Sequence, residues 1–210
     1  MTVIIDPQSS GIAGNMIIGA LVDLGADANK LKEIMESSAI EFGKIEVTFD
    51  RVCKHGINST YCHVEMIENK KAPNYPDFIA KIKNLDLDKK IIDTSINVFK
   101  RIGEAESKVH GCALKDLHFH EVGASDAVAD VIGSIYAYYS LGLDKEEIIG
   151  LPIAVGGGNI KTAHGIIPIP APDSGSTERP SGCAGRSPGS AERPSGCAGR
   201  SPGSVERPAR

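Results

Sequence analysis

The sequence LHFHEVGASD at residues 117–126 carries two imidazoles and two carboxylates within ten positions. Read as an extended segment that enters a helix, it places His118 and His120 on one side of the backbone, because side chains two apart in a strand share a face. Phe119 then points the other way, into the fold. We therefore expect a strand-to-helix junction whose open end carries polar side chains suited to a metal, a substrate or a proton.

The residues that follow predict the helix of this junction. Ser125 is a favoured type of N-cap, and the run at 126–132 has apolar residues at helical spacing. Asp126 and Asp130 are then stacked one turn apart, with Asp126 in the first turn, where the helix dipole favours negative charge. Both carboxylates are expected near the histidine pair. Alternatively, Asp126 only caps the helix and Asp130 only lies on its solvated face.

The mixture of imidazoles and carboxylates favours a divalent first-row metal ion, and no thiolate lies in the stretch to select a softer one. Glu121 is interpreted as a metal ligand, as an acceptor that orients a histidine, or as a catalytic general base. The competing interpretation is a loop of ordinary polar residues. The candidate metal ligands are His118, His120, Glu121, Asp126, Asp130 and His164.

A second candidate site lies at the start of the chain. Thr2–Ile5 reads as a short buried strand that ends at Asp6, and the glycine-containing loop at 8–15 leads into an apolar helix at 16–24. This order places backbone N–H groups and a helix N-terminus at the end of a strand, which favours an anion such as a phosphate. Asp6 either orients a cation there or only starts a turn. The candidate cofactor-binding residues are Asp6, Ser9, Ser10, Gly11 and Gly14.

The remaining pattern predicts an α/β (α+β) fold in which helices flank a mixed sheet. Its further elements are a helix capped by Asp27 and reaching residue 38, a hairpin turning at 55–58, helices at 76–84, 88–110 and 126–141, and a buried strand at 151–155. Residues 1–172 form the predicted domain. Residues 173–210 contain a 14-residue repeat rich in Pro, Gly, Ser and Arg, for which we expect disorder.

Composition narrows the function classes. The 210 residues are 41% hydrophobic and 24% charged, with a net charge of −4. Residues 1–172 carry −6, which argues against a nucleic-acid surface. The N-terminus lacks a signal-peptide pattern, and no apolar run is long enough to cross a membrane. Cys53, Cys62 and Cys112 are expected to be reduced thiols, so we expect a cytoplasmic protein.

Several motifs together resemble the nickel-insertion protein family of the lactate racemase maturation system. They are DPQSSGIAGNM at 6–16, HGI at 55–57, AESKVHG at 105–111, HFHEVGASD at 118–126, LPIAVGGG at 151–158 and KTAHGIIPIPAP at 161–172. The resemblance covers residues 1–172 in the order of the family.

This resemblance implies a nickel chelatase of the lyase class. Such proteins insert nickel into pyridinium-3,5-bisthiocarboxylic acid mononucleotide, which completes the nickel-pincer nucleotide cofactor, and they consume CTP with the help of Mg or Mn. Asn15 is a departure, because the family commonly has Asp there. Family members also continue beyond the PAP element at 170–172 into a region associated with CTP binding, so a truncated form is expected.

Two alternative functions remain open at this point. One is a non-catalytic nickel-binding or assembly module. The other is a metal-dependent hydrolase in which Glu121 acts as the base on a metal-bound water. The expected partners are the mononucleotide and CTP, and neither nucleic acid nor a membrane is expected. The oligomeric state is left open, with a homo-oligomer as one possibility.

Overall fold

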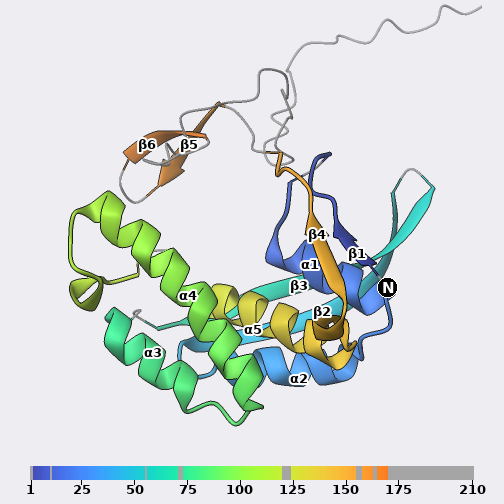
Figure 1. Ribbon diagram of the computed structural model, residues 1–210, viewed down its shortest axis with the longest axis horizontal. Helices are drawn as coiled ribbons and strands as arrows, with labels where there is room; N and C mark the ends of the chain where they lie inside the picture. The colour runs from blue at the N-terminus through green and yellow to red at the C-terminus, as the bar shows by residue number, and fades with distance from the viewer. Residues whose placement is uncertain are drawn as a thin grey trace, which may run out of the picture.

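A computed structural model describes residues 2–9, 11–54, 56–70, 73–119, 124–154, 158–162 and 165–169 (Figure 1). Its elements in chain order are β1 (Thr2–Ile5), α1 (Gly14–Asp23), α2 (Ala28–Ala39), β2 (Gly43–Lys54), β3 (Ile57–Asn69), α3 (Tyr75–Lys83), α4 (Lys89–His110), α5 (Ser125–Ser140), β4 (Glu147–Gly150), β5 (Gly158–Thr162) and β6 (Gly165–Ile169). The predicted tail at 173–210 and the turn residue His55 lie outside the described residues.

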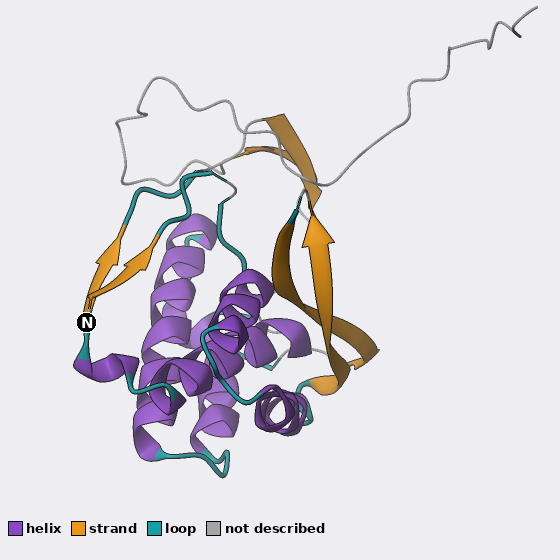
Figure 2. Ribbon diagram, turned by 90° about the vertical axis from the view of Figure 1, so that its right-hand side faces the viewer, coloured by secondary structure: helices purple, strands orange, loops and turns teal. Residues whose placement is uncertain are grey.

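The hairpin of β2 and β3 confirms the predicted antiparallel pair, with Val47 opposite Val64 in its register. Alternate side chains of β2, including Ile45 and Val47, are buried, whereas their neighbours face solvent. This alternation is what a strand covered on one face produces. The helices pack on the apolar face, so the hairpin forms one wall of the fold (Figure 2).

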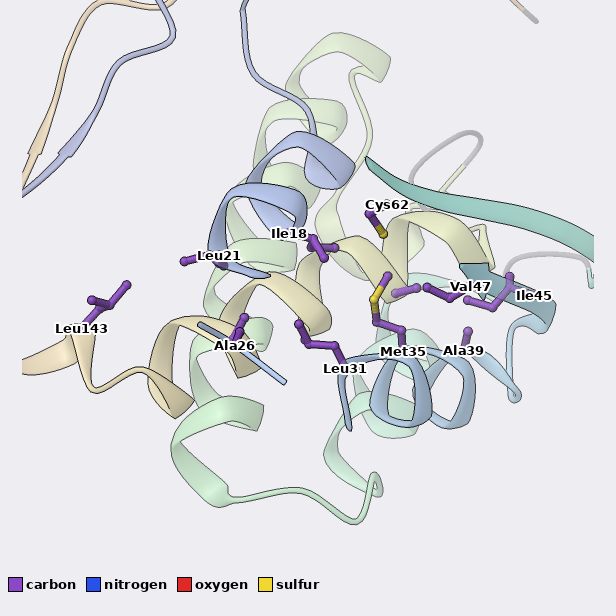
Figure 3. Close-up of a cluster of buried hydrophobic side chains, with 12 residues drawn as sticks. Ile18, Leu21, Ala26, Leu31, Met35, Ala39, Ile45, Val47, Cys62 and Leu143 are labelled. Carbon is purple, nitrogen blue, oxygen red and sulfur yellow. The ribbon is translucent and has the colours of Figure 1, made fainter. Parts of the chain in front are cut away.

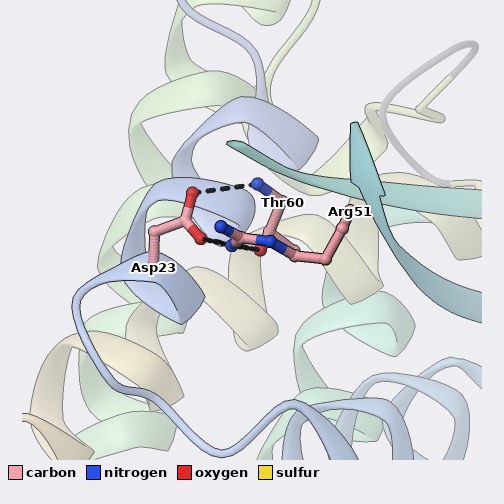
Figure 4. A network of polar contacts seen from close by, with 3 residues as sticks. All are labelled: Asp23, Arg51 and Thr60. Atoms are coloured by element: carbon pink, nitrogen blue, oxygen red, sulfur yellow. Dashed lines mark hydrogen bonds and ion pairs between the residues drawn. The ribbon is translucent and has the colours of Figure 1, made fainter. Parts of the chain in front are cut away.

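Helix α1 is fixed to strand β3 by a close backbone approach and by a polar network. A Cβ atom at Gly19 would lie 2.3 Å from the Thr60 carbonyl oxygen, so only glycine fits at this contact. Asp23, at the end of α1, accepts the Thr60 backbone N–H at 2.9 Å and pairs with Arg51 (Figure 4). These hydrogen bonds, the Thr60 N–H first, lower the pKa of the Asp23 carboxyl. The network occupies the outer edge of β3 at this point.

The predicted helices are confirmed with small shifts at their ends. Asp27 caps α2, since its carboxylate accepts the N–H groups of Asn29 at 3.0 Å and Lys30 at 3.2 Å. Asn74 caps α3 in the same way through the N–H of Asp77. Side-chain caps of this kind satisfy backbone donors that a helix start leaves open, which is why Asp27 predicted the start of α2.

Helix α5 lies between two buried clusters. The first combines α1, α2 and the hairpin around residues such as Ile18, Met35 and Val47 (Figure 3). The second is aromatic, with Phe78 at its centre and Phe42, Phe99 and Phe119 at ring distances of 4.9, 4.8 and 5.0 Å. Ala129 of α5 belongs to the first cluster, whereas Val128 and Ile132 belong to the second. The helix therefore joins both halves of the core.

Strands β1 and β4 form a parallel pair in which Thr2 is opposite Glu147 and Ile5 is opposite Gly150. The predicted strand at 151–155 is wrong, because the strand is Glu147–Gly150 and residues 151–154 are irregular. Pro152 has no N–H to donate to a ladder. The Leu151 N–H still donates to the Ile5 carbonyl at 2.9 Å, so hydrogen bonding to β1 continues one residue beyond the end of β4.

The predicted burial of β1 is also wrong. Ile4 is 62% exposed and Ile149 is 42% exposed. The described strands form three separate two-stranded sheets, so no neighbouring strand in the described part of the chain covers the edges of β1 and β4. An apolar strand is buried only where a partner covers it.

The α/β class is confirmed, since helices pack with both parallel and antiparallel strands. None of the described helices has both the length and the apolar character required to cross a membrane.

Candidate functional site

The loop after β1 folds back on itself before α1 begins. The Asp6 carboxylate accepts the N–H of Gln8 at 3.1 Å, which is the turn-forming arrangement of an Asp-Pro pair. The Gly11 N–H bonds to the Pro7 carbonyl at 3.0 Å, and Gly11 has a φ of 74°, which favours glycine. Ala13 is the N-cap of α1 without a side-chain hydrogen bond. The N-cap residue thus leaves the first backbone N–H groups of α1 without a side-chain cap, and the anion site there stays a prediction.

The structure brings this loop into contact with α5. A Cβ atom at Gly14 would lie 2.4 Å from Cγ and Oδ2 of Asp130, so the Asp130 side chain occupies the space that another residue would fill. Two groups predicted separately from the sequence, the glycine loop and the acidic helix, therefore meet at the N-terminus of α1. Ser9 lies in the exposed turn of the same loop.

Asp130 is a half-buried carboxyl group of α5 with a raised pKa. Burial raises its pKa to about 6, and the negative charge of Asp126 one turn earlier adds to the rise. Its Oδ1 atom is buried without a hydrogen-bond partner among the described residues. A carboxylate oxygen in this state is stabilised by a proton or by a cation, which makes it a candidate ligand.

Cys62 on β3 lies near Asp130 and shares its environment. Burial, together with the negative charge of Asp130, raises the pKa of the thiol to about 12. In the absence of a metal ion the thiol is therefore protonated near neutral pH. Strand alternation places Cys62, which is buried, on the same face as the partly buried Val64, whereas its nearness to α5 is a tertiary contact that the sequence did not reveal. Cys53, Cys62 and Cys112 are free, as predicted.

The histidine stretch is held by its apolar neighbours. Phe119 is buried in the aromatic cluster, 5.8 Å from the ring of Tyr75, which confirms that it points into the fold. Next to it, His118 is exposed and forms an isolated antiparallel bridge with Asn74. The Tyr75 N–H donates to the Leu117 carbonyl at 2.9 Å. The start of α3 thus fixes which side of the stretch faces solvent.

The start of α5 differs from the prediction, because Ser125 is not its N-cap. Ala124 is the N-cap, and the Ser125 side chain is buried against Gly43 of β2, where its hydroxyl finds no partner among the described residues. Asp126 lies in the first turn, as predicted, and its carboxylate accepts the Ala127 N–H at 2.8 Å. Packing against β2 has overridden the capping preference of Ser125.

Four predicted site residues lie outside the described residues: Ser10, His120, Glu121 and His164. Within the described ranges, no three His, Cys, Asp or Glu side chains gather closely enough to hold a metal ion. The described part of the predicted metal site is therefore His118, Asp126 and Asp130, and the roles of all these residues stay predictions.

Comparison with known proteins gives a consistent result. The sequence profile of a family described as nickel insertion protein matches residues 3–176. Two archaeal relatives carry names that describe candidate nickel insertion proteins. The relative from Methanosphaera stadtmanae is 47% identical over 82% of this chain and 44% of its own length, and that from Methanothermobacter thermautotrophicus is 43% identical over 82% and 42%.

A bacterial relative carries a more specific name. The protein from Desulfitobacterium hafniense is named pyridinium-3,5-bisthiocarboxylic acid mononucleotide nickel insertion protein, and it is 39% identical over 78% of this chain and 40% of its own length. The chain thus spans about two-fifths of the length of these relatives. No solved structure matches it significantly.

Proposed function

Because the chain belongs to the nickel insertion protein family, we propose that it binds nickel and takes part in inserting the metal into an organic cofactor precursor. The observation that supports this role best is the state of Asp130. Its carboxylate lies at the start of α1, close to the like charge of Asp126, with one buried oxygen that has no partner among the described residues. A divalent cation would offset the repulsion and fill the vacant hydrogen-bonding position.

The proposed nickel ligands are His118, His120 and Glu121, with assistance from Asp126, Asp130 or His164. Imidazole and carboxylate donors hold nickel less firmly than sulfur donors do. None of the proposed ligands is a cysteine, so the proposed site itself contains no sulfur donor. Such a donor set suits a protein that holds the ion and then releases it to a sulfur-containing acceptor.

We further propose that the acceptor is pyridinium-3,5-bisthiocarboxylic acid mononucleotide, which the name of the Desulfitobacterium hafniense relative contains. Its phosphate would lie at the open start of α1, against the loop of Ser9, Ser10, Gly11 and Gly14. Asp6 would orient an assisting Mg or Mn ion. Glu121 is the proposed general base, and CTP is the proposed nucleotide consumed when the reaction is complete.

Nickel binding tests the proposal. Equilibrium dialysis with metal analysis should show stoichiometric binding by the 210-residue chain and a loss of at least about tenfold in affinity when His118 and His120 are both changed to alanine. His63→Ala is the matched control, because this exposed histidine lies on the hairpin. The affinity should also fall as pH drops through the histidine range, because protons compete with nickel for the same nitrogens.

Unchanged affinity in the double variant would refute the assigned ligands. The two remaining candidate functions make different predictions in a turnover assay. A non-catalytic nickel-binding module would bind the ion without consuming CTP or loading the mononucleotide, whereas a metal-dependent hydrolase would release phosphate in the absence of any nickel acceptor.

A further inference from the structure

The β1–β4 pair presents aliphatic side chains on both of its faces. Val3 is opposite Ile148 and Ile4 is opposite Ile149, so alternation assigns the first pair to one face and the second pair to the other. Parallel strands are almost always covered on both faces. Here Ile4 and Ile149 are exposed on the outer face, and Ile148 is 43% exposed on the inner one. The pair therefore has the composition of a buried sheet without the cover.

One edge of β1 is open as well. The Ile5 carbonyl accepts the Leu151 N–H at 2.9 Å and the Pro7 carbonyl accepts the Ala154 N–H at 3.2 Å, so the backbone groups of these residues point toward the β4 side. Successive residues of a strand point their backbone groups to opposite sides. Those of Ile4 and Asp6 consequently face the other edge, where no strand pairs within the described ranges. Such an edge is a template for a further strand.

A pocket of about 420 Å³ lies beside this edge, between β1 and the helices α1 and α5. Three successive residues of β1 line it, Val3, Ile4 and Ile5, which places it against the open edge as well as beneath the strand. The facing helices contribute aliphatic side chains and Tyr138. Among the described residues that line it, Asp6 is the only charged one. The rest of the described lining is uncharged and mostly aliphatic, so the pocket suits an apolar polypeptide segment.

We propose that this surface docks the part of the family protein that lies outside the matched region, which enters as an added strand along β1 with apolar side chains in the pocket. We call it the docking surface, and its exposed members are Ile4, Ile5, Ile12, Met16, Ile148 and Ile149. The match spans only 44% of the Methanosphaera stadtmanae relative, so more than half of that protein is available to cover it. Contiguous exposed aliphatic residues of this kind mark interaction sites. The inference does not depend on nickel binding.

The test uses a separate polypeptide that comprises the part of the Methanosphaera stadtmanae relative outside the matched region. Isothermal titration calorimetry with the 210-residue chain should show binding, and Ile4→Asp should weaken it by at least about tenfold, since a buried unpaired charge costs more than 1.4 kcal/mol. Val109→Asp is the control, because Val109 is 76% exposed at the end of α4. Circular dichroism checks that both variants remain folded.

Hydrogen exchange supplies a second readout that depends on the added strand. The backbone amides of Ile4 and Asp6 should become protected when the polypeptide binds, whereas the amide of Tyr61 on the hairpin should not change. Absence of binding, equal affinity of Ile4→Asp, or unprotected amides in a complex would each overturn the proposal. A dimer of the chain alone that Ile4→Asp dissociates in light scattering would overturn it in favour of a second copy as the occupant.

Discussion

The hairpin and the β1–β4 pair are both two-stranded and both rich in aliphatic residues, yet their side chains differ in burial. Ile45 and Val47 of β2 are buried under α2 and α5, whereas Ile4 and Ile149 are largely exposed. The difference lies in what packs on each pair, because the helices cover the hairpin and make few contacts with β1 and β4. Apolar composition therefore indicates which strands are suited to burial, whereas tertiary packing decides whether they are buried.

The largest expected effect contrasts the two regions directly. Phe78→Ala removes the centre of the aromatic cluster and should lower the free energy of unfolding by about 3 to 5 kcal/mol. Ile4→Ala should change it by about 0.5 kcal/mol or less, because little of this side chain is buried. Urea unfolding measures both values. Similar losses in the two variants would mean that β1 is covered in solution.

A smaller effect is expected from one added methyl group. Gly19→Ala pushes a Cβ atom against the Thr60 carbonyl oxygen and should cost about 1 to 2 kcal/mol, even after the gain in helix propensity. Gly150→Ala on β4 is the matched change in the open region, where a Cβ atom meets nothing within 4 Å. Thermal unfolding of the two variants compares the regions. A neutral Gly19→Ala would contradict the close approach of α1 to β3.

An effect comparable to that of Gly19→Ala is expected from the titration of Asp130 in α5. Its pKa is raised from 3.8 to about 6, so between these values the folded state holds a proton that the unfolded state releases. Stability should therefore fall as pH rises from 4 to 6 and level off above, by about 1 to 2 kcal/mol after allowance for its partial exposure. Asp130→Asn should lack this loss. If urea unfolding of the two metal-free proteins showed the same dependence of stability on pH, the raised pKa of Asp130 would be contradicted.

Local signals explain what the sequence predicted correctly. Helix α2 begins where Asp27 offers its carboxylate to nearby N–H groups, and the alternation of Ile45 and Val47 marks the covered face of the hairpin. In the same way, Phe119 between two histidines was expected to point inward, and it does. Each of these inferences depends on neighbours within a few positions along the chain, so no tertiary information was needed.

The wrong predictions arose where distant residues decide the outcome. Ser125 is a residue type that favours the N-cap, but its side chain packs against Gly43 of β2, where the lack of a Cβ atom leaves space for it. A strand was predicted at 151–155, but the strand that pairs with β1 is Glu147–Gly150. The contact of Gly14 with Asp130 joins two predicted site elements more than a hundred residues apart, and no spacing along the chain encodes it.

The parallel pair also has a consequence for how the protein is made. Thr2 and Glu147, which bond across the pair, are separated by 145 positions. At a synthesis rate of about 5 to 20 residues per second, β1 leaves the ribosome roughly 7 to 30 s before β4 does. The helices and the hairpin can form in that interval, because their contacts are closer in sequence. Strand β1 thus stays without its partner β4 until the helices and the hairpin have been synthesised.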